Sequence, residues 1–265
     1  MNTPATSPNA RKQLSSSILL WVRNDQPRQT GMDYWKGPHS GIISVNPGLK
    51  EYRQIHMAED NPGRWPTTAR VETTIAADRK IDGIAEVTLR SVLSTLQGRK
   101  QNAMAYKDEI NVFRRTLLYA GLPGMSRWYD VAPSEAVGSR AVVYLRRRDG
   151  VSARTFRTFI NKQLVSSLAG TGVLKELRTQ TFLPWSQKLW DTPDVAHDNS
   201  HDQRFHASVM IGFADEAARD AFFSSDTVRD LSEQLTPLAS AIHAYDVTAA
   251  LTYVQDARVL PHHEA

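Results

Sequence analysis

Cysteine is absent from the 265 residues, which excludes disulfide bonds, thiol nucleophiles and thiolate metal ligands. Long apolar runs are also missing, because no stretch approaches the ~20 apolar residues of a membrane-spanning helix. Residues 1–14 hold Ser, Thr, Pro, Asn and charged side chains, without the apolar segment of a signal peptide. We therefore expect a cytoplasmic protein without a membrane partner.

A strong excess of one charge is missing too. The chain has 32 Lys and Arg against 28 Asp and Glu, a net charge of +4. This excess is weak evidence for a nucleic-acid partner, and the Arg run 146–148 ends an expected strand, where a solvated edge accounts for it. A glycine-rich phosphate loop, a dinucleotide-binding fingerprint and a serine nucleophile elbow are absent. We expect neither a nucleic-acid partner nor a cofactor.

Residues 32–41 combine aromatic side chains, a Gly-Pro pair and a histidine. Pro38 has no amide hydrogen to bond the carbonyl of Tyr34, so a helix over this segment must bend. Trp35 and His39 are four residues apart and lie near one face of that helix. An aromatic wall beside one titratable group suits ligand binding or proton transfer near neutral pH, although a core histidine bonded to a carbonyl gives the same pattern.

The first half of the chain predicts the order β-α-β-β-α-β. Runs of apolar or alternating residues indicate strands, and Pro, Gly, Asn and Asp mark the breaks between elements. The expected elements are strands at 17–23, 49–57, 84–90 and 111–119, helices at 32–45 and 91–106, and a short additional strand at 70–76. This order is that of a ferredoxin-like unit.

A second β-α-β-β-α-β order follows a linker rich in Gly and Pro. The expected elements are strands at 140–147, 173–183, 205–213 and 243–253, and helices at 152–168, 215–223 and 228–238. The sequence Leu174-Lys175-Glu176-Leu177-Arg178 repeats Leu49-Lys50-Glu51-Tyr52-Arg53 at an offset of 125 residues. The expected domains are a disordered tail (1–14), a first unit (15–120), a linker (121–139), a degenerate second unit (140–258) and a tail (259–265).

Two such units predict an α+β fold in which tandem ferredoxin-like repeats pack as a pseudo-dimeric α/β barrel. Each four-stranded sheet is covered by helices on one face only, and packing the two bare faces together saves roughly 25 cal/mol per Å² of apolar surface. At the position that matches the Tyr-Trp…His segment, the second unit has residues 159–164, Phe-Ile-Asn-Lys-Gln-Leu, without a histidine. If His39 is functional, the protein has one site.

The first unit resembles the EthD family. The resemblance covers about residues 17–120 and rests on Tyr34-Trp35, His39, Pro47-Gly48-Leu49, Tyr52 and the third-strand sequence Asp82-Gly83-Ile84-Ala85-Glu86-Val87. Members of the family are ferredoxin-like dimeric α/β-barrel proteins. The resemblance implies an apolar cavity in the barrel for a small aromatic or polyketide-like molecule. It also implies a range of cofactor-free activities, which includes cyclases, decarboxylases and monooxygenases.

We predict the site between the first sheet and the kinked helix. Tyr34 and Trp35 form its wall, and Tyr52 and His56 line it from the second strand, because alternate strand residues share a face. His39 acts there as a general acid or base, or as a donor to a developing oxyanion. Two alternatives stay open: a haem protein, because other α/β-barrel families bind haem through one histidine, and a non-enzymatic accessory protein of a degradation pathway. Association of two chains into a homodimer also stays open.

The histidines at 197, 201 and 206 are the strongest candidate metal ligands. Two of them stand at a helical spacing of four residues, but their segment is polar and lacks an apolar face that would hold a helix. We therefore expect no metal site there. Trp185 and Trp190 flank the long polar loop at 184–202, where we expect them to anchor the loop on the barrel, with closure of the barrel mouth as the alternative.

Overall fold

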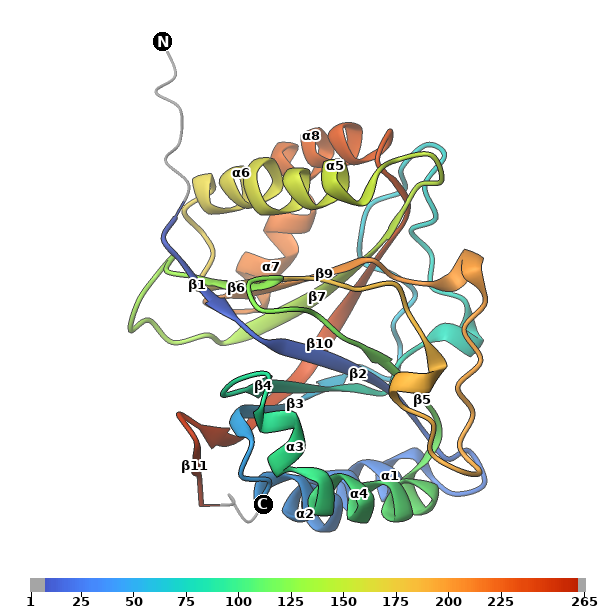
Figure 1. The fold of residues 1–265 in the computed structure, drawn as a ribbon. Coiled ribbons are helices and arrows are strands. Elements are labelled where there is room, and N and C mark those ends of the chain that lie inside the picture. Colours follow the sequence, from blue (N-terminus) through green and yellow to red (C-terminus); the bar gives the residue numbers. More distant parts are fainter. Residues whose placement is uncertain (1–7, 262–265) are drawn as a thin grey trace.

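Two layers of helices enclose the strands in the computed structural model, which describes residues 8–261 (Figure 1). The strands form one antiparallel sheet with the order β1-β6-β8-β9-β7-β10-β3-β4-β2-β5, and β11 pairs with β10. Their bounds are β1 Ala10–Gln13, β2 Ser15–Val22, β3 Leu49–Met57, β4 Gly83–Leu89, β5 Phe113–Tyr119, β6 Ser126–Tyr129, β7 Ser139–Arg147, β8 Glu176–Thr181, β9 Ala207–Phe213, β10 Ala239–Gln255 and β11 Arg258–Val259.

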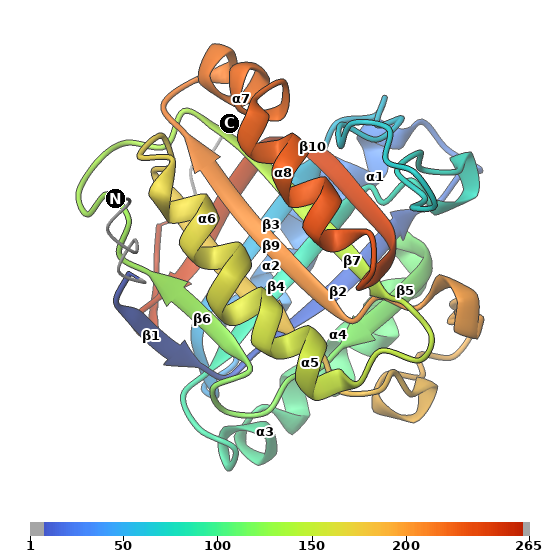
Figure 2. The same ribbon diagram turned by 90° about the horizontal axis from the view of Figure 1, so that it is seen from above.

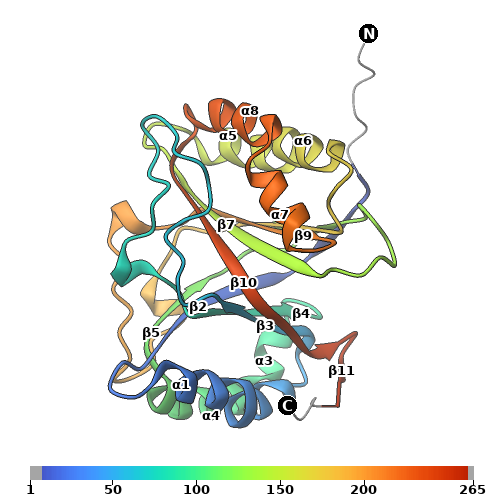
Figure 3. The ribbon, with the colours of Figure 1, turned by 180° about the vertical axis from the view of Figure 1, so that it is seen from behind.

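The helices fall into two groups on opposite sides of the strands, as the view from behind also shows (Figure 3). The first group is α1 Arg28–Tyr34, the π-helical turn η1 Trp35–His39, α2 Ser40–Ser44, α3 Ser94–Gln97 and α4 Arg99–Val112. The second group is α5 Ala153–Thr158, the π-helical turn η3 Phe159–Leu164, α6 Val165–Gly170, α7 Glu216–Phe223 and α8 Asp226–Leu235. Short 3₁₀ turns lie at η2 Ala77–Arg79, η4 Gln187–Leu189 and η5 His201–Gln203.

The strand order contains the same arrangement twice. In β3-β4-β2-β5 and in β8-β9-β7-β10, the first strand of the group lies between its third and fourth strands. This is the strand order of a ferredoxin-like unit. Strand β10 pairs with β3 and joins the two groups. We call the helices α1–α4 with β2, β3, β4 and β5 the first layer, and α5–α8 with β7, β8, β9 and β10 the second layer.

The space between the two groups of strands is filled by an apolar core. Its members come from both groups and include Leu19, Trp21, Ile55, Tyr144 and Tyr245, each at most 2% exposed. Seen from above, α5, α6 and α8 cross the outer face of β9 and β7 (Figure 2). The chain is therefore a mixed α+β protein with its sheet faces packed together and its helices outside, as the strand and helix pattern predicted.

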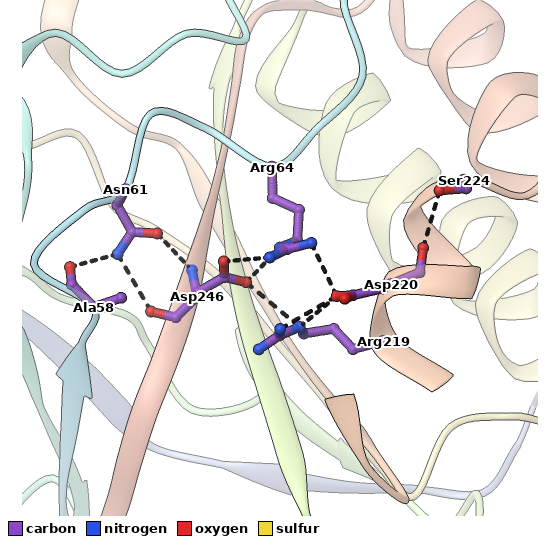
Figure 4. A network of polar contacts seen from close by, with 7 residues as sticks. All are labelled: Ala58, Asn61, Arg64, Arg219, Asp220, Ser224 and Asp246. Carbon is purple, nitrogen blue, oxygen red and sulfur yellow. Dashed lines mark hydrogen bonds and ion pairs between the residues drawn. The ribbon is translucent and has the colours of Figure 1, made fainter. Parts of the chain in front are cut away.

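An ion-pair network ties the long loop after β3 to the second layer (Figure 4). Arg64 binds the carboxylate of Asp246 through Nε at 2.5 Å and Nη2 at 2.7 Å, and its Nη1 donates to Asp220 Oδ1 at 3.0 Å. Asn61 accepts from the amide of Asp246 and donates to the carbonyl of Ala58. A loop of the first half is thus fixed to β10 and α7.

Several sequence-based boundaries were wrong. Residues 10–13, expected in a disordered tail, form β1 and pair with β6, which lies within the expected linker. Residues 70–76 form isolated bridges rather than a strand. Helix α4 continues to Val112, so the fourth strand of the first group begins at Phe113 instead of residue 111. Residues 1–7 and 262–265 lie outside the described part of the chain.

Candidate ligand-binding site

A cavity of about 380 Å³ lies in the first layer, between the outer face of the strands and the helices. Most of its lining is apolar. The strands contribute Ile18, Leu20, Leu49, Tyr52, Ala85, Val87, Leu89, Phe113 and Leu118, and the helices contribute Trp35, His39, Ile43, Asn102, Tyr106 and Glu109. The equivalent space of the second layer is about 10 Å³. The site is therefore on the helix side of the sheet, and not in the space between the two groups of strands.

The π-helical turn η1 places Trp35 and His39 at the cavity. Pro38 lies inside this turn and, without an amide hydrogen, donates no backbone hydrogen bond there. Gln54 Nε2 donates to the Trp35 carbonyl at 2.8 Å. Tyr253 Oη and Ser40 Oγ both donate to the Lys36 carbonyl at 2.7 Å. The widened turn is thus stabilised by side chains from β3, β10 and α2.

His39 forms a pair with Asp108 of α4. The distance from His39 Nδ1 to Asp108 Oδ2 is 2.8 Å, and the His39 side chain is 6% exposed. Tyr34 Oη donates to the other carboxylate oxygen at 2.8 Å. The hydrogen bond with His39 is the main cause that lowers the pKa of Asp108. An ionised carboxylate only accepts, so Nδ1 carries the hydrogen in neutral His39, and Nε2, which has no hydrogen bond among residues 8–261, has the lone pair.

Glu109 is the second acidic group of the site. It is 2% exposed and accepts from Trp190 Nε1 at 3.0 Å and from Thr192 Oγ1 at 2.6 Å. Burial raises the pKa of Glu109 to about 7, against the lowering effect of these two donors. Trp190 also lines the cavity and contacts Tyr106 edge-on. The loop at 184–202 therefore closes the first layer over its cavity.

The predicted site residues occupy different positions. Trp35, His39 and Tyr52 line the cavity, whereas Tyr34 and His56 do not. His56 stacks on Trp35 with 4.7 Å between ring centroids, and burial lowers the pKa of His56 to about 4. Tyr52 accepts a hydrogen bond from Gln54, and burial raises its pKa. Tyr34 thus contacts Asp108, the partner of His39, and His56 packs on Trp35.

Gly83 provides the room for Trp35. A Cβ atom at this position would lie 2.3 Å from the Trp35 ring, so any larger residue would displace the indole. The Trp35 Nε1 atom is buried without a hydrogen-bond partner among the described residues. Trp35 is 0% exposed, so the close packing around Gly83 fixes the position of its indole.

Sequence reasoning missed Asp108, Glu109 and Trp190 as members of the site. The predicted helix ended near residue 106, so the two acidic residues fell between elements. A helix that continues to Val112 places Asn102, Tyr106 and Glu109 on one face, at spacings of four and three residues. Because the predicted helix ended six residues too early, Asp108 was not identified as the partner of His39.

Of the three histidines considered as metal ligands, His197 and His206 bond the backbone, whereas His201 is exposed. His197 Nδ1 lies 2.7 Å from the Thr116 carbonyl, and its Nε2 accepts from the Thr192 amide at 2.9 Å. His206 Nδ1 accepts from the Arg147 amide. Among residues 8–261, no three His, Asp or Glu side chains are grouped so that they could hold a metal ion. Within the same range, no helix is long and apolar enough to cross a membrane.

Comparisons with known proteins extend over nearly the whole chain at very low identity. A proposed monooxygenase from Lactobacillus acidophilus NCFM has a TM-score of 0.50 and 11% identity, over 95% of this chain and 100% of its own. An anthrone oxidase-like protein has a TM-score of 0.55 and 7% identity, over 91% of this chain and 93% of its own. The chain shares the ferredoxin-like α/β-barrel fold of these proteins. No protein-family model and no curated protein matches the sequence.

Proposed function

We propose that this chain is an EthD-like barrel protein that binds a small aromatic or polyketide-like molecule in the cavity of the first layer. His39 moves a proton on that molecule without a cofactor. The observation that carries the proposal is the His39–Asp108 pair at the wall of an apolar cavity. The cavity of about 380 Å³ falls within the range of about 300–1,000 Å³ typical of small-molecule sites.

The chemistry follows from the two acid–base groups. His39 Nε2 takes a proton from an acidic C–H or O–H of the ligand, and the resulting imidazolium is stabilised by the Asp108 carboxylate. The electron pair left on the ligand becomes an enolate or phenolate. Glu109, with its pKa raised to about 7, supplies or receives the second proton near neutral pH.

We further propose that the fold is a tandem repeat packed as a pseudo-dimer. The offset of 125 residues relates Glu51 to Glu176 and Arg53 to Arg178. Arg53 Nη1 contacts Glu176 Oε1 at 2.8 Å, and Arg178 Nη1 contacts Glu51 Oε1 at 2.5 Å. Reciprocal contacts of this kind are expected at a two-fold interface.

The same offset relates two tryptophans. Trp65 lies on a loop of the first half and packs into the second layer, where its Nε1 donates to Ser232 of α8 at 2.9 Å. Trp190, 125 residues later, lies on a loop of the second half and donates to Glu109 of α4. Each half therefore covers the helices of the other, which supports the proposed pseudo-symmetry and a single cooperative domain over residues 15–258.

The proposal is tested with anthrone, whose methylene group loses a proton to give an enolate. Wild type should accelerate the exchange of these hydrogens for deuterium, followed by NMR, and His39→Ala should lose about 10²–10⁴-fold of the acceleration. Asp108→Asn should retain more activity than His39→Ala, because it removes the orienting acceptor and leaves the base in place.

His201→Ala is the matched control, because His201 is exposed and lies outside the cavity lining. It should exchange anthrone like wild type. If anthrone or a panel of hydroxylated naphthalenes binds wild type and His39→Ala equally and no exchange is accelerated, the catalytic part of the proposal is wrong and the chain is an accessory binding protein.

Haem binding is the second candidate, and one observation favours it. A histidine whose Nδ1 is bonded to a carboxylate and whose Nε2 is free has the arrangement of a metal-ligating histidine. His39 would then hold the iron, and haem would supply redox chemistry. The cavity volume lies near the lower end of the small-molecule range, which favours two or three fused rings over a tetrapyrrole. Titration with hemin decides: a Soret band that is lost in His39→Ala supports haem.

A further inference from the structure

A second hollow lies beside the cavity. An open cleft of about 360 Å³ shares Leu14, Leu89, Val92 and Pro123 with the lining of the apolar cavity. The two hollows therefore adjoin each other, as an apolar inner part and an outer part at the surface. We call the outer part the mouth cleft.

The mouth cleft is lined by three cations and by no acidic residue. Lys12 comes from β1, Lys50 from β3 and Arg90 from the end of β4. Lys50 Nζ donates to Gln13 Oε1 at 3.0 Å, and Arg90 Nη1 donates to the Pro47 carbonyl at 3.3 Å. Both acceptors are neutral. Within residues 8–261, none of the three cations forms an ion pair, so no carboxylate neutralises them.

In the second half, the lysine that corresponds to Lys50 is paired with a carboxylate. Lys175 stands 125 residues after Lys50, and its Nζ is paired with the carboxylate of Glu135. The inner cavity, by contrast, has no Lys or Arg in its lining among the described residues. Lys12, Lys50 and Arg90 thus lie beside the apolar cavity and not inside it, where the polar end of a bound molecule would emerge.

We infer that the ligand of the first layer is an anionic amphiphile. Its aromatic body occupies the inner cavity, and a carboxylate or phosphate group lies in the mouth cleft against Lys12, Lys50 and Arg90. The inference rests on the proposed function and adds the charge of the ligand to it. Exposed ion pairs contribute modestly one by one, so three of them should increase affinity for an anionic ligand by roughly 10- to 100-fold over a neutral one.

An anionic membrane surface is the rival occupant of this face. Val92, Leu93, Leu96, Leu122 and Leu189 are 47–72% exposed, and three of them line the cavity. Apolar side chains near cations are also found on proteins that bind membranes. We favour the small amphiphile because the cations line a concave cleft that adjoins the cavity.

The test compares three ligands that share one apolar body: 4-(1-naphthyl)butanol, its phosphate monoester, and 4-(1-naphthyl)butanoic acid. Binding to the full chain is measured by calorimetry at two salt concentrations. We expect at least one anion to bind at least tenfold more tightly than the alcohol, with the advantage falling at high salt. The comparison of the acid with the phosphate identifies the preferred group.

The variant Lys50→Gln/Arg90→Gln should reduce the advantage of the anion to within about twofold and leave binding of the alcohol unchanged. Arg154→Gln/Arg157→Gln is the matched control. It removes the same charge from another basic cleft, lined by Arg127, Arg154, Arg157 and Lys162, and should keep the full advantage.

Each remaining outcome is decisive. Equal affinity for the anions and the alcohol overturns the inference and leaves the proposed function intact. The same conclusion follows if both double variants lose the advantage of the anion equally. Failure of all three compounds to bind contradicts the proposed function itself. Wild type is also sedimented with phosphatidylserine vesicles. If it sediments, if Lys50→Gln/Arg90→Gln does not, and if no anion is preferred over the alcohol, the inference is overturned in favour of a membrane surface.

Discussion

The two helix layers have similar backbone arrangements, but they differ in their side chains and in the space that they enclose. Both contain a π-helical turn, η1 at Trp35–His39 and η3 at Phe159–Leu164, and the offset of 125 residues relates His39 to Leu164 and Trp35 to Ile160. The first layer encloses about 380 Å³ beside His39, whereas the second encloses about 10 Å³ beside Leu164. One layer has the features of a binding site and the other those of a core.

The difference shows that the unusual turn does not by itself mark a functional site. Turns of the π type are frequent at such sites, but here the apolar copy packs into the interior. The distinguishing features are the polar residues added around the turn in the first layer: His39 on the turn, and Asp108 and Glu109 on α4.

Removing a leucine side chain from each layer should affect stability unequally. Leu164→Ala in the filled layer should lower the free energy of unfolding by about 3–5 kcal/mol. Leu20→Ala should cost at least about 1 kcal/mol less, because Leu20 borders the cavity and lacks contacts on that side. Urea denaturation of both variants measures the difference. Equal losses would mean that the first layer is as tightly packed as the second.

Glu109 should make the stability of the first layer depend on pH. Because its pKa is raised from the ordinary 4.5 to about 7, its contribution is present at low pH and is lost as pH rises through about 7. At about 1.4 kcal/mol per pKa unit, the upper bound of this loss is about 3 kcal/mol. The stability of Glu109→Gln minus that of wild type should therefore increase between pH 5 and pH 8. A difference that is constant with pH would contradict a buried, titrating Glu109.

Asp108 should show the opposite pH dependence with a smaller size. Its lowered pKa means that its contribution is present above the unfolded-state value near 4 and is lost as pH falls through the folded-state pKa. Asp108→Asn should cost about 1 kcal/mol at pH 7, since it weakens a hydrogen bond to a charged group that is partly exposed. The difference from wild type, measured by thermal unfolding, should shrink below about pH 4. Persistence of the full difference at pH 3 would show that the cost is not electrostatic.

The positions of the strands along the sequence could be predicted because they depend on local patterns of residues. The strand at 49–57 has the predicted bounds. Alternation along that strand also placed Tyr52 and His56 on one face. These features are decided by neighbours in sequence, so a single chain suffices to find them.

The composition of the site could not be predicted to the same extent. Asp108 is 69 residues from His39 in sequence, and Trp190 is 81 residues from Glu109, so only the folded chain brings them together. Residues 10–13 are mostly exposed and polar, and their strand exists because β6 offers an edge. The tryptophan pair at 65 and 190 was the missed signal, because it shares the offset already visible in the repeated strand sequence.

The central claim is that a ligand enters the first layer and not the second. Indole ¹⁵N–¹H signals test it directly, because Trp35 and Trp190 line the cavity of the first layer and Trp65 lies in the core of the second. On titration with 1-naphthol, we predict that the signals of Trp35 and Trp190 shift and that the signal of Trp65 stays in place. A shift of Trp65 with Trp35 and Trp190 unchanged would contradict the account.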